Sequence, residues 1–237
     1  MYDNSTIVID SKGEGLNRYI AKVFLWMFMG LGLTALSTWA IVTWISPAFP
    51  EVFSYLTHSL LVIFLLQVLL VGWVAVRIEK MRTSTAMALY ITYALVNGLT
   101  IGYGAWVLAS VNSGAITAAF GITAISFGVM AIFGLKTQQD LTRAGNLFRM
   151  GLIGIIVLSV VNWFIGSAPL DFLICIAGLF IFLGLTAYHT SQIKNYYHHA
   201  SGDVRLANNL AIIGALMLYL SFINLFMFIL RLMTGRR

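Results

Sequence analysis

The sequence predicts an all-α polytopic membrane protein in which seven transmembrane helices form one bundle. Two observations lead to this class. The 237 residues are 60% hydrophobic and only 9% charged, with a mean hydropathy of +0.91, whereas about 25% of the residues of a soluble domain are charged. The apolar residues also fall into continuous runs of about the 20 residues that a helix needs to cross the hydrocarbon core of a bilayer.

Seven apolar runs reach this length. They cover residues 20–45, 60–76, 85–109, 114–135, 147–165, 172–190 and 211–232. Each is expected to be helical, because lipid offers no partner to an unpaired backbone group. The runs are continuous and do not alternate, which argues against an outer-membrane barrel. Residues 1–19 are polar and are interpreted as a cytoplasmic tail, and residues 20–237 as one transmembrane domain.

The basic residues of the connections predict the orientation. Lys and Arg occur in the N-terminal flank and in the connections 77–84, 136–146 and 191–209, and they are absent from 46–57, 110–113 and 166–170. The positive-inside bias therefore places the N-terminus in the cytoplasm. The end of the chain breaks this pattern, because seven crossings put Arg231, Arg236 and Arg237 outside. Either the last helix crosses despite these charges or it dips and returns. We favour seven crossings, since early spans usually dominate orientation.

Polar side chains within the predicted spans are the candidates for a functional site, because polar groups are costly in lipid and usually face the bundle interior. The pore-lining candidates are Tyr93, Asn97, Asn162, Asn224 and, at the outer start of the sixth span, Asp171. Taken singly, each amide and hydroxyl is more readily explained by hydrogen bonding between helices, and Asp171 by capping of its helix. No Asp or Glu of the sequence lies deep in a predicted span.

Nothing in the sequence indicates an enzyme, a cofactor or a nucleic-acid partner. A Gly-rich phosphate loop, a nucleophile elbow and an HExxH motif are all missing from it. His198 and His199 are adjacent in a predicted loop, which is not the spacing of metal ligands on a helix. The net charge of +6 comes from residues of short connections that form no basic stripe with aromatic residues. The lipid bilayer is the expected partner.

Several motifs follow one another along the chain. They are VNGLT at 96–100, AFGITAISF at 119–127, GLKTQQDL at 134–141, MGLIG at 150–154, NWF at 162–164, AYHTSQIK at 187–194 and GALMLYLSFINLF at 214–226. Together they resemble the transmembrane Bax-inhibitor-motif family, and its bacterial members above all. The resemblance covers nearly the whole chain after the N-terminal tail. It implies a bacterial inner membrane protein, a central helix wrapped by the other six, and a pH-sensitive calcium leak.

The resemblance also implies a gate. In relatives, an acidic residue of the sixth helix and one of the last helix share a proton, and losing it leaves charge that attracts a hard cation such as calcium. This chain has His189 and Ser221 at these positions, and it has Arg77 and Arg231 at basic positions near the pore. Because His and Ser supply no negative charge, we expect calcium conduction to be altered or lost. His189 is still able to sense pH, since imidazole titrates near 6.5; alternatively, the two side chains form a hydrogen bond at an inactive site.

Two functions follow from the resemblance. The first is a channel-like leak, with calcium as the permeating ion and no bound cofactor. The second is a non-transporting regulator that binds membrane proteins such as a quality-control protease complex through the polar tail. The missing acids favour the second function, and the retained arginines and polar helix faces favour the first. We favour the leak because the resemblance is so extensive.

Overall fold

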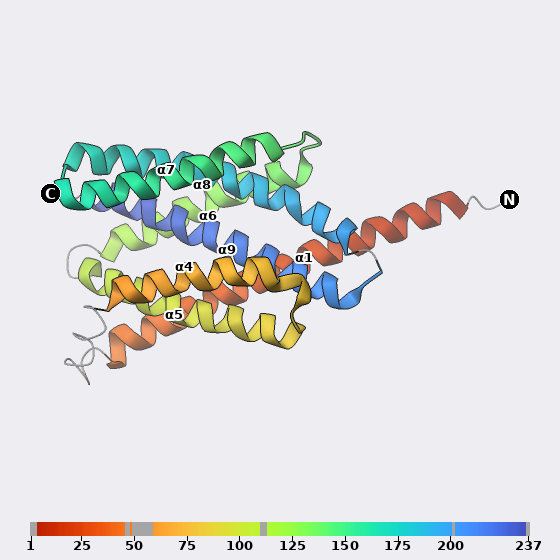
Figure 1. The fold of residues 1–237 in the computed structure, drawn as a ribbon, viewed down its shortest axis with the longest axis horizontal. Coiled ribbons are helices and arrows are strands. Elements are labelled where there is room, and N and C mark those ends of the chain that lie inside the picture. The colour runs from red at the N-terminus through yellow and green to blue at the C-terminus, as the bar shows by residue number, and fades with distance from the viewer. Residues whose placement is uncertain (1–3, 46–47, 49–58, 110–112, 201, 236–237) are drawn as a thin grey trace. The chain divides into compact units, whose positions relative to one another are not determined.

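The computed structural model describes residues 4–45, 48, 59–109, 113–200 and 202–235. In these ranges the regular structure is helical and contains no β-strand. Figure 1 shows the helices in chain order. They are α1 (Asn4–Ala40), the π-helical segment η1 (Ile41–Ile45), α4 (Leu60–Arg77), the 3-10 turn η2 (Ile78–Lys80), α5 (Thr83–Ala109), α6 (Ser113–Lys136), α7 (Thr142–Ile165), α8 (Ala168–His199) and α9 (Val204–Thr234).

The predicted fold class is confirmed. Among the described residues, seven helices are long and apolar enough to cross a membrane, and each corresponds to one predicted span. The α9 helix continues without interruption from Val204 to Thr234. This continuity leaves no break at which the helix turns back within the membrane, as the alternative of a dip and return requires. Arg236 and Arg237 lie outside the described residues.

Several helices extend beyond the predicted spans, α1 and α8 by the most residues. The first begins at Asn4, within the polar tail, and α8 continues to His199. The prediction that His198 and His199 lie in a loop is therefore wrong, since both belong to the last turn of α8. Hydropathy detects only the part of a helix that lies in lipid. The 32 residues of α8 measure about 48 Å at 1.5 Å per residue, well beyond a hydrocarbon core of about 30 Å.

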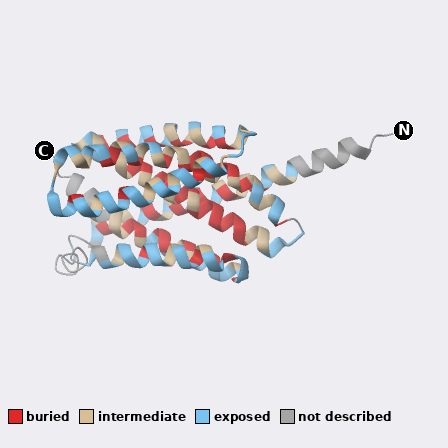
Figure 2. Cartoon of the chain, turned by 45° about the horizontal axis from the view of Figure 1, so that its top comes forward, coloured by how far each residue is buried: buried red, intermediate tan, exposed pale blue. Residues whose placement is uncertain are grey.

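Burial differs widely among the spans. In the apolar stretch of α9, 67% of the residues are buried, compared with 11% in the apolar stretch of α7. Figure 2 shows buried and exposed residues interleaved along the helices, as expected where one side packs on protein and another faces lipid. A single central helix wrapped by the other six stays a prediction.

The chain divides into two compact units. Unit 1 consists of Met1–Val107 and Ile193–Leu216. In this unit α1 packs closely on α5. The hydroxyl groups of Thr34 and Thr38 donate hydrogen bonds to the carbonyl oxygens of Ala94 and Gly98, both at 2.9 Å. A Cβ atom at Gly98 would lie 2.6 Å from the carbonyl oxygen of Thr34. Small residues of α5 therefore allow the two backbones to approach, as is typical of membrane helices.

Unit 2 consists of Leu108–Gln192 and Met217–Arg237. Aromatic side chains of α6 and α9 pack against one another in this unit, with ring centroids 5.7 Å apart for Phe120 and Phe222 and 5.4 Å apart for Phe127 and Phe222. The α6 and α8 backbones also approach closely, because a Cβ atom at Gly134 would lie 2.3 Å from the carbonyl oxygen of Ala187. These contacts fix α8 and α9 where they carry the candidate site.

Candidate functional site

The two candidate gate residues meet in unit 2. His189 lies on α8 and Ser221 on α9, and the Nδ1 atom of the imidazole is 3.1 Å from the Oγ atom of the serine. Ser221 is buried, with 1% of its surface exposed. Residues that are 32 positions apart in the sequence thus form one hydrogen-bonded pair between two membrane helices.

The contacts of Ser221 indicate which histidine nitrogen carries the proton. The Ser221 hydroxyl also lies 3.0 Å from the carbonyl oxygen of Met217 in its own helix and donates to it. A hydroxyl group has one proton and two acceptor lone pairs. With this proton directed at Met217, Ser221 accepts a hydrogen bond, and Nδ1 of His189 is the donor. A second proton on the imidazole would bind at Nε2 and would leave the contact with Ser221 intact.

Arg231 forms an ion pair with Asp171. The arginine lies in the last turn of α9, and Asp171 lies in the first turn of α8. The suggestion that Asp171 caps its helix is wrong, because α8 begins earlier, at Ala168, and the Oγ atom of Ser167 accepts the N–H group of Leu170 at 3.4 Å. The helix extends through Pro169, since proline is tolerated in a first turn, where its missing N–H group would lack a partner anyway.

Arg77 is the fourth candidate at the gate. It is the last residue of α4, it is exposed, and it belongs to unit 1, whereas His189, Ser221 and Arg231 belong to unit 2. A role for Arg77 at the gate therefore stays a prediction.

The described hydrogen bonds of Asn162, Asn224 and Asn97 join residues that are close in the sequence. The side-chain oxygen of Asn162 accepts the N–H group of Ser167 at 3.1 Å, just beyond the end of α7. The amide nitrogen of Asn224 donates to the carbonyl oxygen of Leu220 at 2.8 Å, and Asn97 accepts the hydroxyl of Thr100 at 3.2 Å. Such hydrogen bonds stabilise a turn or the end of the helix that carries the asparagine. The role of the three asparagines in a pore stays a prediction.

Tyr93 is the remaining pore-lining candidate. It is buried in α5 and, with Tyr90, lines a small apolar hollow in unit 1. The other lining residues are Leu70, Val71, Val74, Ala86, Leu89, Ile212 and Leu216. Apart from the two tyrosines, the lining consists of aliphatic side chains, which offer no ligands to an ion.

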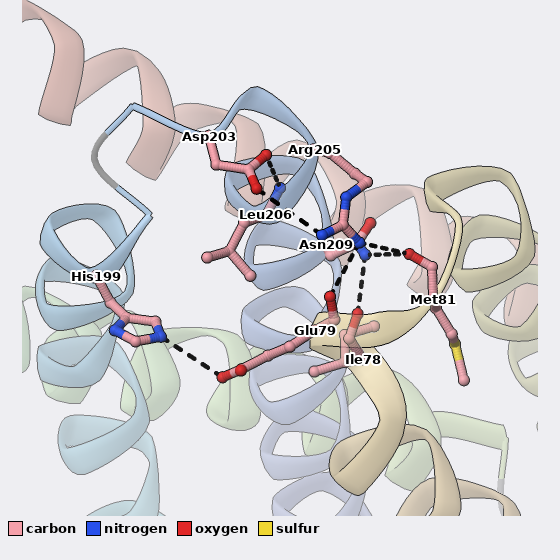
Figure 3. Close-up of polar contacts among 8 residues, drawn as sticks. All are labelled: Ile78, Glu79, Met81, His199, Asp203, Arg205, Leu206 and Asn209. Atoms are coloured by element: carbon pink, nitrogen blue, oxygen red, sulfur yellow. Dashed lines mark hydrogen bonds and ion pairs between the residues drawn. The ribbon is translucent and has the colours of Figure 1, made fainter.

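A polar cluster at the η2 turn was not predicted from the sequence (Figure 3). The Nη1 atom of Arg205 donates to the carbonyl oxygens of Glu79 at 2.9 Å and Met81 at 3.1 Å. The side-chain nitrogen of Asn209 donates to the carbonyl oxygens of Ile78 at 2.8 Å and Met81 at 2.9 Å. The start of α9 thereby holds the turn between α4 and α5. An asparagine at the edge of a long apolar run is the sequence signal that indicates such a contact.

His199 also approaches this turn. Its Nε2 atom lies 3.6 Å from the Oε1 atom of Glu79, and more than half of each side chain is exposed, so the pair contributes little to stability. The described residues contain no group of three or more His, Cys, Asp and Glu side chains placed to hold a metal ion.

The comparisons with known proteins identify the family. The model of the family described as "Inhibitor of apoptosis-promoting Bax1" matches residues 16–237. The chain belongs to the Bax inhibitor family. Among the relatives is the inner membrane protein YbhL of Escherichia coli strain K12, which is 35% identical over 94% of each chain. An uncharacterized protein of Borreliella burgdorferi is 36% identical over 93% of each chain, and an uncharacterized membrane protein of Streptococcus pyogenes is 30% identical over 97% of each.

Membership in the Bax inhibitor family confirms the resemblance seen in the motifs. It agrees with the seven candidate spans, and the YbhL relative is an inner membrane protein. The chain is therefore a membrane protein of this family. The side of the membrane on which its N-terminus lies stays a prediction.

Proposed function

We propose that this protein is a weak, proton-regulated cation leak in which His189 and Ser221 stand in place of a pair of acids. The observation that carries the proposal is the hydrogen bond of 3.1 Å between these two side chains. It joins α8 to α9 at the two positions to which the family resemblance assigns the acids of the gate. On this proposal the gate contact is kept while its charge is changed.

The chemistry of the pair disfavours calcium. Calcium takes six to eight oxygen ligands and usually several carboxylates, whereas this pair offers one serine oxygen whose proton points to Met217. Because a neutral imidazole carries no charge, the pair does not attract a divalent cation. Calcium conduction is therefore expected to be weaker than in relatives with two acids.

The pair has a defined response to protons. A proton on Nε2 of His189 adds a positive charge and leaves the hydrogen bond to Ser221 in place. The added charge repels cations, so the leak is expected to fall as the pH falls. The Asp171 carboxylate does not offset this charge, because it is already paired with Arg231.

Flux from vesicles tests this proposal. The purified protein is reconstituted, and potassium and calcium efflux are measured between about pH 4 and 8, a range that extends well below the value near 6.5 at which a free imidazole titrates. Wild type is expected to conduct less at the acidic end, and His189→Ala is expected to lose this dependence. Ser191→Ala is a matched control, because Ser191 is a buried α8 serine that bonds only within its own helix. An identical pH response in wild type and His189→Ala would refute the role of the imidazole.

A second candidate function is the binding of other membrane proteins. It is supported by α1, which begins at Asn4 and thus continues the first span as a helix into the polar tail. An exposed pair between Glu14 and Arg18, 3.7 Å apart, follows in the same helix. If this segment contacts a membrane quality-control protease, deleting residues 4–13 should abolish co-purification of that protease and leave vesicle flux unchanged. Co-purification that survives the deletion would exclude residues 4–13 as the contact.

A further inference from the structure

Arg149 and Tyr188 form a charged contact beside the gate pair. The Nη2 atom of Arg149 on α7 lies 2.7 Å from the hydroxyl oxygen of Tyr188 on α8, and its guanidinium carbon lies 4.9 Å from the centre of the tyrosine ring. Gly145 makes this approach possible, because a Cβ atom there would lie 2.3 Å from the ring. The arginine is exposed, whereas Tyr188 is 5% exposed. The guanidinium is therefore held in one place by a buried side chain.

The charge of Arg149 is not balanced within the part of the chain that the structure describes. No carboxylate there lies within ion-pair distance of Arg149. A guanidinium has five N–H donors, and a single bond to Tyr188 is described. Tyr188 accepts this bond, so its own O–H proton is left to donate. Several donors and one positive charge thus meet at one point on α7.

Arg149 lies at the edge of an apolar run. It is the third residue of the run 147–165 and lies near the start of the candidate span Thr142–Ile165, within about one helical turn of the polar residues before the run. An arginine at this depth extends its side chain towards the membrane interface, where lipid headgroups lie. At that level the abundant anion is the phosphate of a phospholipid, which matches the fork of a guanidinium.

The surface next to Arg149 is suited to a lipid tail. Ile153, Ile156 and Val160 follow at four, seven and eleven residues, so they continue the same helix face. Their exposed fractions are 64%, 56% and 51%. Asn146, three residues before the arginine, is also exposed and adds an amide donor. The face thus has polar donors at one end and an apolar stripe that runs from them into the membrane.

We propose that Arg149 and Tyr188 bind the phosphate group of an anionic phospholipid, whose acyl chain lies along Ile153, Ile156 and Val160. Basic positions between membrane helices bind anionic lipid headgroups in this way. An anionic lipid is favoured over a zwitterionic one, because only the former neutralises the charge of Arg149. A free phosphate ion offers the same oxygens but lacks the chain that covers the apolar stripe.

Native mass spectrometry of the full-length protein tests this site. Phosphatidylglycerol and phosphatidylcholine with identical acyl chains are titrated onto wild type, Arg149→Gln, Arg149→Lys and Tyr188→Phe. The control is Arg143→Gln, which removes the same charge from the first turn of α7. Arg143 has an acid nearby. The pKa of the Asp140 carboxyl is lowered chiefly by hydrogen bonds from Thr142 and further by Arg143.

Wild type and Arg143→Gln are expected to bind phosphatidylglycerol with equal affinity and to bind phosphatidylcholine more weakly. Arg149→Gln should weaken phosphatidylglycerol binding by about tenfold or more, the loss expected for a charge-assisted hydrogen bond. Arg149→Lys and Tyr188→Phe, which keep the charge and the ring respectively, should show smaller losses. Inorganic phosphate should not displace the lipid, and displacement would overturn the assignment to a lipid. Equal binding by Arg149→Gln and Arg143→Gln would overturn the site itself. Lipid binding is read without ion flux, so a failure here is distinct from a failure of the proposed leak.

Discussion

The Nδ1 atom of His189 donates a hydrogen bond to the Oγ atom of Ser221, and this bond of 3.1 Å joins two membrane helices in unit 2. The Ser221 hydroxyl donates its own hydrogen bond to the carbonyl oxygen of Met217. The pair is therefore an ordered chain of two bonds with one neutral imidazole. A pair of carboxyl groups behaves differently, because it shares a proton and gains charge when that proton leaves.

Replacing Ser221 with alanine removes the acceptor of the His189 N–H group. We expect the free energy of unfolding to fall by about 0.5–1.5 kcal/mol, the net contribution of one hydrogen bond, because the pair is part-buried. Denaturant titration in detergent measures it. Ser191→Ala should cost less, because Ser191 donates only to the Tyr188 carbonyl oxygen of its own helix. Equal losses for the two variants would show that the bond between helices contributes nothing.

The ion pair between Asp171 and Arg231 should show energetic coupling. The exposed fractions of its side chains are 41% for Arg231 and 16% for Asp171, so solvent screens the pair in part. We expect a coupling of about 1 kcal/mol, at the upper end for surface pairs. A double-mutant cycle with Asp171→Asn and Arg231→Gln, read by the same titration, isolates this value. Additive losses would mean that the two side chains do not interact.

Asn209 should matter more to stability than Arg205, although both hold the η2 turn. Asn209→Leu removes both donors to the carbonyl oxygens of Ile78 and Met81 from a position with no exposed surface. The expected loss is about 1–3 kcal/mol, because the Ile78 carbonyl oxygen is left without its side-chain donor, whereas the Met81 carbonyl oxygen keeps the bond from Arg205. Arg205→Ala should cost less than about 1 kcal/mol, since the exposed Glu79 carbonyl can bond to water. Thermal unfolding of both variants gives the order, and a reversed order would contradict this account of the turn.

Two glycines of α6 should respond in opposite ways to alanine. A Cβ atom at Gly134 would lie 2.3 Å from the Ala187 carbonyl oxygen, whereas at Gly128 it would meet nothing within 4 Å. Gly134→Ala must push α6 and α8 apart, so we expect a loss of about 1–3 kcal/mol. Gly128→Ala should be neutral or should stabilise by up to about 1 kcal/mol, because alanine favours helices. A stabilising Gly134→Ala would show that the two backbones do not touch.

The spans are predictable from the sequence, because a segment that crosses lipid must be apolar and must pair its backbone groups within itself. The helix ends are not predictable in this way, as α8 shows. Its last turns lie beyond the apolar run, where hydropathy carries no signal, and so the sequence predicts a loop at His199 that the structure does not contain. The sequence predicts a cap at Asp171 because it does not show that Pro169 lies inside the first turn of α8.

The pairing of side chains was predictable only in part. The family resemblance selected His189 and Ser221, and the structure shows them in contact. Composition and spacing do not select Arg149 and Tyr188, which lie on different helices 39 residues apart. Their contact depends on the space that Gly145 leaves, and such a space arises only from the packed fold.

Calcium flux from vesicles of wild type and of the double variant His189→Asp, Ser221→Asp tests the central claim most directly. The central claim is that a gate without negative charge conducts calcium poorly. We predict low calcium efflux for wild type at every pH, and for the double variant an efflux that rises as the pair of acids loses its shared proton. A wild type that conducts calcium with the same magnitude and the same pH response as the double variant would contradict the account.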